Sequence, residues 1–128
     1  MAPLTRLERE AIEMFLAGKH PALPAFREQL AHSTVANRKL EYASEVELNV
    51  DPSVPDAPLN GRFMLGGVHA DVPGLQRGVG FSLYIDGGRL RGLDAITFDE
   101  PWPQSWPQIP SYRLVYSDKP ALLDRYAK

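Results

Sequence analysis

The sequence predicts an α+β fold in which two helices cover one face of a mostly antiparallel sheet of about five strands. Apolar residues recur at helical spacing near the start of the chain and alternate with polar residues from Lys39 onward. A strong hairpin signal, Asp86-Gly87-Gly88, lies between two alternating runs. The chain has 128 residues and neither an internal repeat nor a linker, so residues 1–128 are expected to form a single domain.

The first helix is predicted to begin at Thr5, because Thr5-Arg6-Leu7-Glu8 has the form of a capping box. Apolar residues follow at helical spacing, and Gly18 is suited to end the helix. A second, shorter helix is expected to open between Pro21 and Pro24. Its apolar face would consist of Leu23, Phe26 and Leu30.

The first strand is predicted over residues 39–50, where polar and apolar residues alternate. Its outer face would be acidic, with Glu41, Glu45 and Glu47. A proline-containing loop follows, and residues 63–72 form the next predicted strand. The Gly66-Gly67 pair in that strand indicates a bulge or a close approach of another backbone.

A central hairpin is expected next, with an outgoing strand that begins at Val79 and a return strand over residues 89–98. Its two-residue turn is either Asp86-Gly87 or Gly87-Gly88, and the sequence leaves both open. Residues 112–116 offer one more strand. A terminal helical turn is expected to start near Asp118 and Pro120.

Both tryptophans of the chain fall in one proline-rich loop, residues 98–110. Trp102 and Trp106 each precede a proline, which pushes each of them toward extended backbone. Such a stiff loop either caps the core or forms a preorganised recognition surface, and we expect at least one ring to be partly exposed. With the adjacent carboxylates Asp99 and Glu100, the two rings are the predicted partner-binding residues.

Asp94 has two predicted orientations in the return strand of the hairpin. Strict alternation would place its carboxyl group on the apolar face, where burial favours the acid form and suits a catalytic acid. A bulge at Gly92 would instead turn Asp94 to solvent and bring Leu93 inward. The cost of burying an unpaired carboxylate favours the bulge.

His69 and Asp71 are two residues apart in a predicted strand, so both side chains leave the same face. Such a pair can orient a general base or supply two metal ligands, but polar residues at outward positions need no chemistry. A candidate pocket would combine the pair with Asp94 near Trp102. With three histidines and no cysteine in the chain, we expect neither a metal site nor a cofactor.

The charge and hydropathy of the chain disfavour two classes of partner. A net charge of −2 and a pI near 5.9 argue against a nucleic-acid binder, which normally presents a basic face. The apolar runs are too short to cross a membrane or to act as a signal peptide. The expected location is therefore the cytoplasm.

A middle portion of the sequence resembles small bacterial proteins of unassigned activity, of the immunity or partner-binding type. The resemblance lies in residues 69–75, in Gly78-Val79-Gly80-Phe81 and in residues 93–103. It contains no catalytic motif and therefore transfers neither an activity nor a functional residue. It implies a non-enzymatic bacterial protein.

The leading functional hypothesis is a non-enzymatic module that binds a protein partner with a basic surface, as an immunity-type or regulatory protein does. It would use the Trp-Pro loop and the nearby acidic surface as a rigid plug. One alternative is a small enzyme or ligand-binding protein with a pocket near Asp94, His69 and Trp102. Another is a homodimer formed through the uncovered sheet face, with a purely structural Trp loop.

Overall fold

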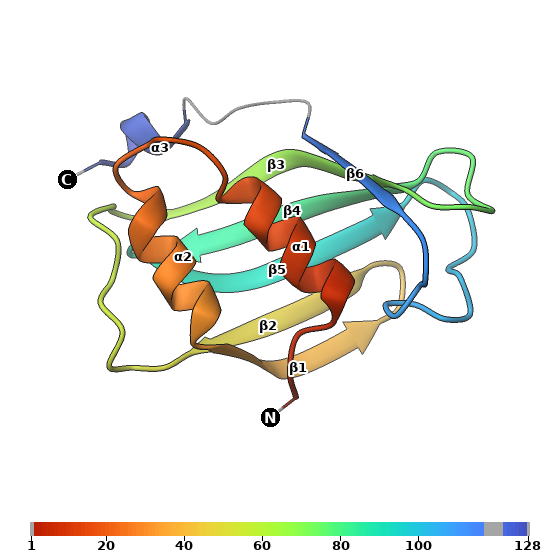
Figure 1. Ribbon diagram of the computed structural model, residues 1–128, viewed down its shortest axis with the longest axis horizontal. Helices are drawn as coiled ribbons and strands as arrows, with labels where there is room; N and C mark the ends of the chain where they lie inside the picture. The colour runs from red at the N-terminus through yellow and green to blue at the C-terminus, as the bar shows by residue number, and fades with distance from the viewer. Residues whose placement is uncertain (1, 117–121, 128) are drawn as a thin grey trace.

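The computed structural model describes residues 2–116 and 122–127, which form an α+β fold around one six-stranded antiparallel sheet. The sheet order is β1-β2-β5-β4-β3-β6. Both longer helices lie on the side of the sheet that faces the viewer in Figure 1. The elements are α1 (Arg6–Phe15), α2 (Leu23–Ala31), β1 (Ser33–Leu40), β2 (Ser44–Val50), β3 (Arg62–Asp71), β4 (Val79–Asp86), β5 (Arg89–Thr97), β6 (Arg113–Tyr116) and α3 (Leu122–Arg125).

The two predicted helices form, although α1 ends at Phe15 with Leu16 as its C-cap, before the predicted end at Gly18. The Thr5 hydroxyl accepts a hydrogen bond from the Glu8 backbone N–H at 3.3 Å, and the Glu8 carboxylate accepts one from the Thr5 N–H at 2.9 Å. This is the predicted capping box. The residues that α2 buries include those of its predicted apolar face, Leu23, Phe26 and Leu30.

One buried polar residue in each helix forms hydrogen bonds with the sheet region. Glu8 is buried and holds the Arg38 guanidinium of β1 through contacts of 2.6 and 2.9 Å. Gln29 of α2 is fully buried; its amide nitrogen donates to the Gly88 carbonyl, and its amide oxygen accepts from the Leu90 N–H. Because these polar groups are satisfied, both helices can be buried against the same face.

The first strand region differs from its prediction, and the sheet therefore has six strands where about five were expected. Residues 39–50 belong to a hairpin of β1 and β2, and Tyr42 lies almost fully exposed between the two strands. In β1 the register shifts between Val35 and Asn37. This irregularity interrupts the alternation of polar and apolar residues by which a strand is recognised.

The turn of the central hairpin consists of Gly87-Gly88, because Asp86 pairs with Arg89 across it. Both glycines have positive φ angles, 58° and 75°, which a type I′ turn requires. The other turn that the sequence allowed, Asp86-Gly87, does not form.

A bulge in β5 decides the orientation of Asp94. Tyr84 pairs with Gly92 and Ile85 pairs with Leu90, so Arg91 is the extra residue. Beyond it the side chains change faces: Leu93 is buried, and Asp94 lies on the other face. The predicted change of faces is confirmed, with Arg91 and not Gly92 as the extra residue, and strict alternation through residues 89–98 is wrong. A second predicted bulge is also present, since the register of β3 shifts across Gly66-Gly67.

The C-terminal segment packs beside β3. The Tyr126 ring stacks on Phe63 with centroids 4.3 Å apart, and Leu123 of α3 is fully buried. Asp118 and Pro120, where the terminal turn was predicted to start, lie outside the described residues. Within residues 2–116 and 122–127, no helix has the length and apolarity needed to cross a membrane.

Candidate binding surface on the open face of the sheet

The sheet has one face covered by α1 and α2 and a second face, here called the open face, that points away from them. In β4 the side chains of Leu83 and Ile85 are buried beneath the helices, whereas Tyr84 between them is exposed. Side chains alternate between faces along a strand, so Tyr84 marks the open face. Directly paired residues on neighbouring strands share a face, which identifies the other residues of this surface.

Large apolar side chains are exposed on the open face. Tyr84 lies directly opposite Met64 of β3. Nearer the other end of these strands, Ile96 of β5 and Val115 of β6 lie in one row across the sheet, with Gly80 and His69 between them. We call Met64, Tyr84, Ile96 and Val115 the apolar patch; their exposed fractions are 45%, 39%, 42% and 40%.

Phe98 and His69 fill the space above Gly80. A Cβ atom at Gly80 would lie only 3.1 Å from the Phe98 ring, so the absence of a side chain lets this ring approach the sheet. The His69 ring stacks against Phe98 with centroids 5.5 Å apart, and its Nε2 lies 2.9 Å from the Arg77 carbonyl oxygen. The aromatic pair thus forms part of the surface between Ile96 and Val115.

Three carboxylates lie beside the apolar patch. Asp94 of β5 is directly opposite Glu45 of β2, and Glu47 is the next residue on the same face. We call Glu45, Glu47 and Asp94 the acidic cluster. Burial raises the pKa of Asp94, the charge of Glu45 raises it further, and a hydrogen bond from Tyr84 lowers it. Like charges placed opposite each other in a sheet are destabilising, so this arrangement has a cost to the fold.

Two shallow hollows on the open face meet at Tyr84 and Arg91. The first has a volume of about 380 Å³ and is lined by Asn37, Lys39, Gly92 and the acidic cluster as well. The second has about 430 Å³ and extends over Met64 to Arg62 and Asp86. Tyr84 therefore separates a hollow lined by three carboxylates, here called the acidic hollow, from one that contains Met64.

The predicted pair of His69 and Asp71 is not formed, although both residues lie on the open face. The Asp71 carboxylate accepts a hydrogen bond from the Arg113 guanidinium at 2.9 Å. His69 is engaged by Phe98 and by the Arg77 carbonyl. Among the residues that the structure describes, no group of three or more His, Cys, Asp or Glu could hold a metal ion.

The candidate pocket that combined Asp94, His69 and Trp102 is not assembled. β4 lies between the strands that carry His69 and Asp94, and the hollow that Asp94 lines contains neither His69 nor Trp102. Trp102 packs on Trp106, whose ring stacks on Phe81 at 6.4 Å. Phe81 is buried on the helix-covered face, so the two tryptophans lie on the other side of the sheet from Asp94.

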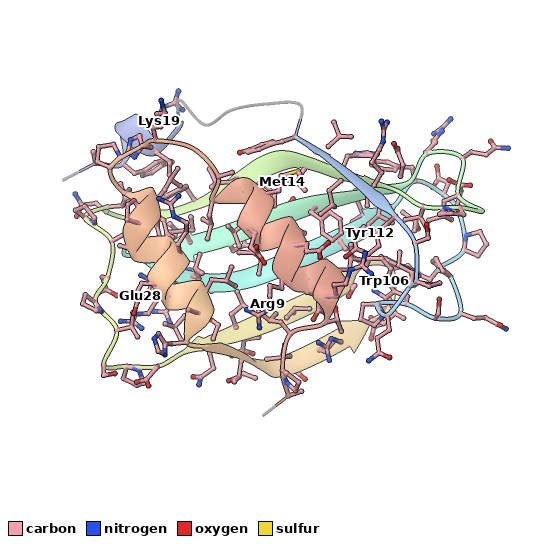
Figure 2. All side chains as sticks on the ribbon, in the orientation of Figure 1. Arg9, Met14, Lys19, Glu28, Trp106 and Tyr112 are labelled. Carbon is pink, nitrogen blue, oxygen red and sulfur yellow. The ribbon has the colours of Figure 1, made fainter. Side chains whose placement is uncertain are left out.

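The Trp-Pro loop packs against the end of the core. The rings of Trp102 and Trp106 are 4.6 Å apart and each is half-buried, which confirms that at least one is partly exposed. Figure 2 shows Trp106 and Tyr112 at the same end of the molecule, near the beginning of α1. The Tyr112 hydroxyl donates to the Glu10 carboxylate at 2.7 Å. Burial, followed by this hydrogen bond, raises the pKa of Tyr112 to about 12.

The acidic residues at the start of the loop have different environments. The Glu100 carboxylate accepts hydrogen bonds from the backbone N–H groups of Gln76 and Arg77 at 2.8 and 2.9 Å, which lower its pKa. It therefore ties the loop to the β3–β4 connection. Asp99 is exposed and has a φ angle of 61°. Binding of a partner through these two residues and the tryptophans stays a prediction, and the packing of the loop favours a structural role.

The residues of the apolar patch were missed by the sequence reasoning. The signal was present, because Tyr84 and Met64 occupy positions that alternate with buried residues and would be polar on a solvated face. Comparison with known proteins gives no further guidance: no family model, curated protein or solved structure matches this chain. The geometry of the open face is therefore the basis on which a function can be assigned.

Proposed function

We propose that this chain is a non-enzymatic protein-binding module, of the immunity or regulatory type, that docks its partner on the open face. The observation that carries the proposal is the apolar patch, whose large side chains are exposed on the face that α1 and α2 leave uncovered. The row of Ser82 and Asp94 divides the apolar patch into two parts. Exposed apolar surface rimmed by polar groups marks interaction sites in soluble proteins. Here the rim includes the acidic cluster and Arg62.

The shape of the surface favours a protein partner over a small ligand. Small-molecule sites bury most of their ligand in a concave pocket, whereas both hollows at Tyr84 are shallow depressions between neighbouring side chains. A tyrosine at the centre of a surface supplies a large contact area and loses little side-chain conformational entropy on binding. Exposed groups on five strands, from Val115 of β6 to Glu45 of β2, lie in neighbouring rows of the sheet and suit a flat protein surface.

The Trp-Pro loop has a supporting role in this proposal. Phe98 is part of the open face, and Glu100 holds the β3–β4 connection that also carries Arg77, the partner of His69. The loop thereby orders one end of the binding surface before a partner arrives. Preorganisation of this kind lowers the entropic cost of association.

A pair of matched lysine variants tests the proposal. Ile96→Lys places a charge in the apolar patch, whereas Leu40→Lys makes the same chemical change at an equally exposed residue. Leu40 lies opposite the buried Ser44 and therefore on the helix side of the sheet. A protein captured from a bacterial lysate by the wild-type chain should be lost with Ile96→Lys and retained with Leu40→Lys. Retention by both variants would contradict docking on the open face.

Self-association is the competing use of the same face. Sedimentation equilibrium of the purified chain, run with both lysine variants, separates the two. The proposal predicts a monomer in all three samples. A wild-type dimer that Ile96→Lys converts to monomer would instead assign the apolar patch to a homodimer interface.

A further inference from the structure

We infer that the partner inserts an arginine or lysine side chain into the acidic hollow beside Tyr84. This inference rests on the proposed function, since it concerns the chemistry of whatever docks on the open face. The occupant would place its cationic head among Glu45, Glu47 and Asp94 and its apolar neighbours on the apolar patch. Register, charge and the position of the Tyr84 ring support this choice.

The strand register brings the three carboxylates together. Asp94 pairs with Glu45, and Gly92 pairs with Glu47, so two neighbouring rows of the sheet contribute acidic groups. Gly92 lies between Glu47 and Tyr84 in its row and lines the hollow, and a Cβ atom there would come within 3.0 Å of the Val46 carbonyl oxygen. A side chain entering there would meet carboxylates on one side and the tyrosine ring on the other.

The acidic cluster contains more negative charge than the neighbouring cations offset. Lys39 of β1 lines the same hollow and lies directly opposite Glu45, and its ammonium group is 3.7 Å from the Glu41 carboxylate. Arg91 is a single guanidinium shared between the two hollows. Burial raises the pKa of Tyr84, and the charges of Asp94 and Glu45 raise it as well, in agreement with a negative potential at the ring. A cation from outside would relieve this repulsion.

Two further pairs of opposite charges lie on the open face. Arg62 donates to Asp86 at 3.1 Å, and Arg113 donates to Asp71 at 2.9 Å. These pairs lie on the β3 side of the face, away from the acidic cluster on β2 and β5. The hollow is thus lined by three carboxylates and two cations, and this excess of negative charge selects a basic group there.

The Tyr84 ring suits the stem and the head of a long cationic side chain. Its exposed face adjoins Met64 on one side and the acidic hollow on the other. Tyr84 and Asp94 line the same hollow, and burial together with the charge of Asp94 raises the pKa of the tyrosine hydroxyl. Arginine and lysine bury their methylene stems on apolar surface and favour the faces of aromatic rings.

Three labelled peptides provide the test, each an acetylated octapeptide in which leucine alternates with arginine, citrulline or glutamate. Citrulline keeps the shape of arginine and removes its charge. Fluorescence anisotropy at about 50 mM salt should show the arginine peptide binding at least about ten-fold more tightly than the citrulline peptide. The glutamate peptide should bind most weakly. Equal affinity for arginine and citrulline, or no binding of the arginine peptide, would overturn the inference.

Charge-removing variants locate the effect. Glu47→Gln combined with Asp94→Asn should weaken the arginine peptide about five- to ten-fold and leave the citrulline peptide unchanged. Glu28→Gln is the control for loss of charge, because Glu28 lies on α2, on the other side of the sheet. Equal weakening by Glu28→Gln would show only long-range attraction and would contradict the hollow as the site.

Partner capture by Ile96→Lys and peptide binding by the acidic variants together distinguish failure of the inference from failure of the proposed function. If Ile96→Lys abolishes capture of the partner but the acidic variants change nothing, the open face binds and the cationic contact is wrong. If the acidic variants weaken the arginine peptide but Ile96→Lys leaves partner capture intact, the hollow binds cations and the proposed docking surface is wrong.

Discussion

The two faces of this sheet are made from the same strands and have opposite properties. On the helix-covered face, Leu83, Ile85 and Leu93 are buried, and polar residues such as Gln29 have their hydrogen bonds satisfied. On the open face, rings and aliphatic groups are exposed, and Asp94 lies opposite another carboxylate. The comparison indicates that stability comes from one face, which leaves the other free to carry groups that do not stabilise the fold.

The largest difference between the faces should appear at two adjacent residues. Leu83→Ala removes a fully buried side chain and should lower the free energy of unfolding by about 3 kcal/mol. Tyr84→Ala changes the next residue on the open face and should cost less than about 1 kcal/mol. Urea denaturation measures both values. Equal losses would mean that the open face is a second core, and the comparison would fail.

The Trp-Pro loop should behave like the covered face. Trp106→Ala removes a half-buried ring that stacks on Phe81 and packs on Trp102, so we expect a loss of about 2 kcal/mol by urea denaturation. The variant should still capture the partner under conditions where it is folded. If the free energy of unfolding falls by less than about 0.5 kcal/mol and the variant no longer captures the partner, the loop and not the open face is the binding surface.

The smallest predicted effect is a gain in stability at Asp94. Its folded pKa is raised above the ordinary value of 3.8, so ionisation destabilises the fold as the pH rises from below 3.8 through the folded pKa. Asp94→Asn removes this penalty and should stabilise the protein by about 0.5 kcal/mol at pH 7, because the group is partly exposed and its charge is screened. At pH 3 the difference should be close to zero. A loss of stability at pH 7 would show that Asp94 is favourable to the fold.

The sequence predicted the parts of the fold whose signals are local. The capping box at Thr5, the Gly66-Gly67 bulge and the orientation of Asp94 all follow from short motifs or from the cost of burying charge. The β1–β2 hairpin was missed because Tyr42, which lies exposed in the turn, continues the alternation of residues 39–50. The earlier part of β1 was missed because its register shifts between Val35 and Asn37. Local patterns carry no information across such a shift.

The binding surface was harder to predict because it depends on strand order. Glu45 and Asp94 are far apart in the chain and become neighbours only when β2 pairs with β5. Trp102 can be singled out from the sequence because tryptophan is rare and the loop is rich in proline. The exposure of Tyr84 can be predicted only when the face that the helices cover is known. A sequence pattern shows which residues of a strand share a face. Whether that face is covered or exposed depends on the strands and helices that pack beside it.

The most direct test of the open face as the binding surface is methyl NMR during titration with the leucine–arginine peptide. Methyl groups of Met64, Ile96 and Val115 report on the open face, and those of Ile12 and Ile109 report on α1 and the Trp-Pro loop. We predict that the peptide shifts the resonances of the first group and leaves those of the second unchanged. Shifts confined to Ile12 and Ile109 would contradict the account and place binding on the helix side of the sheet.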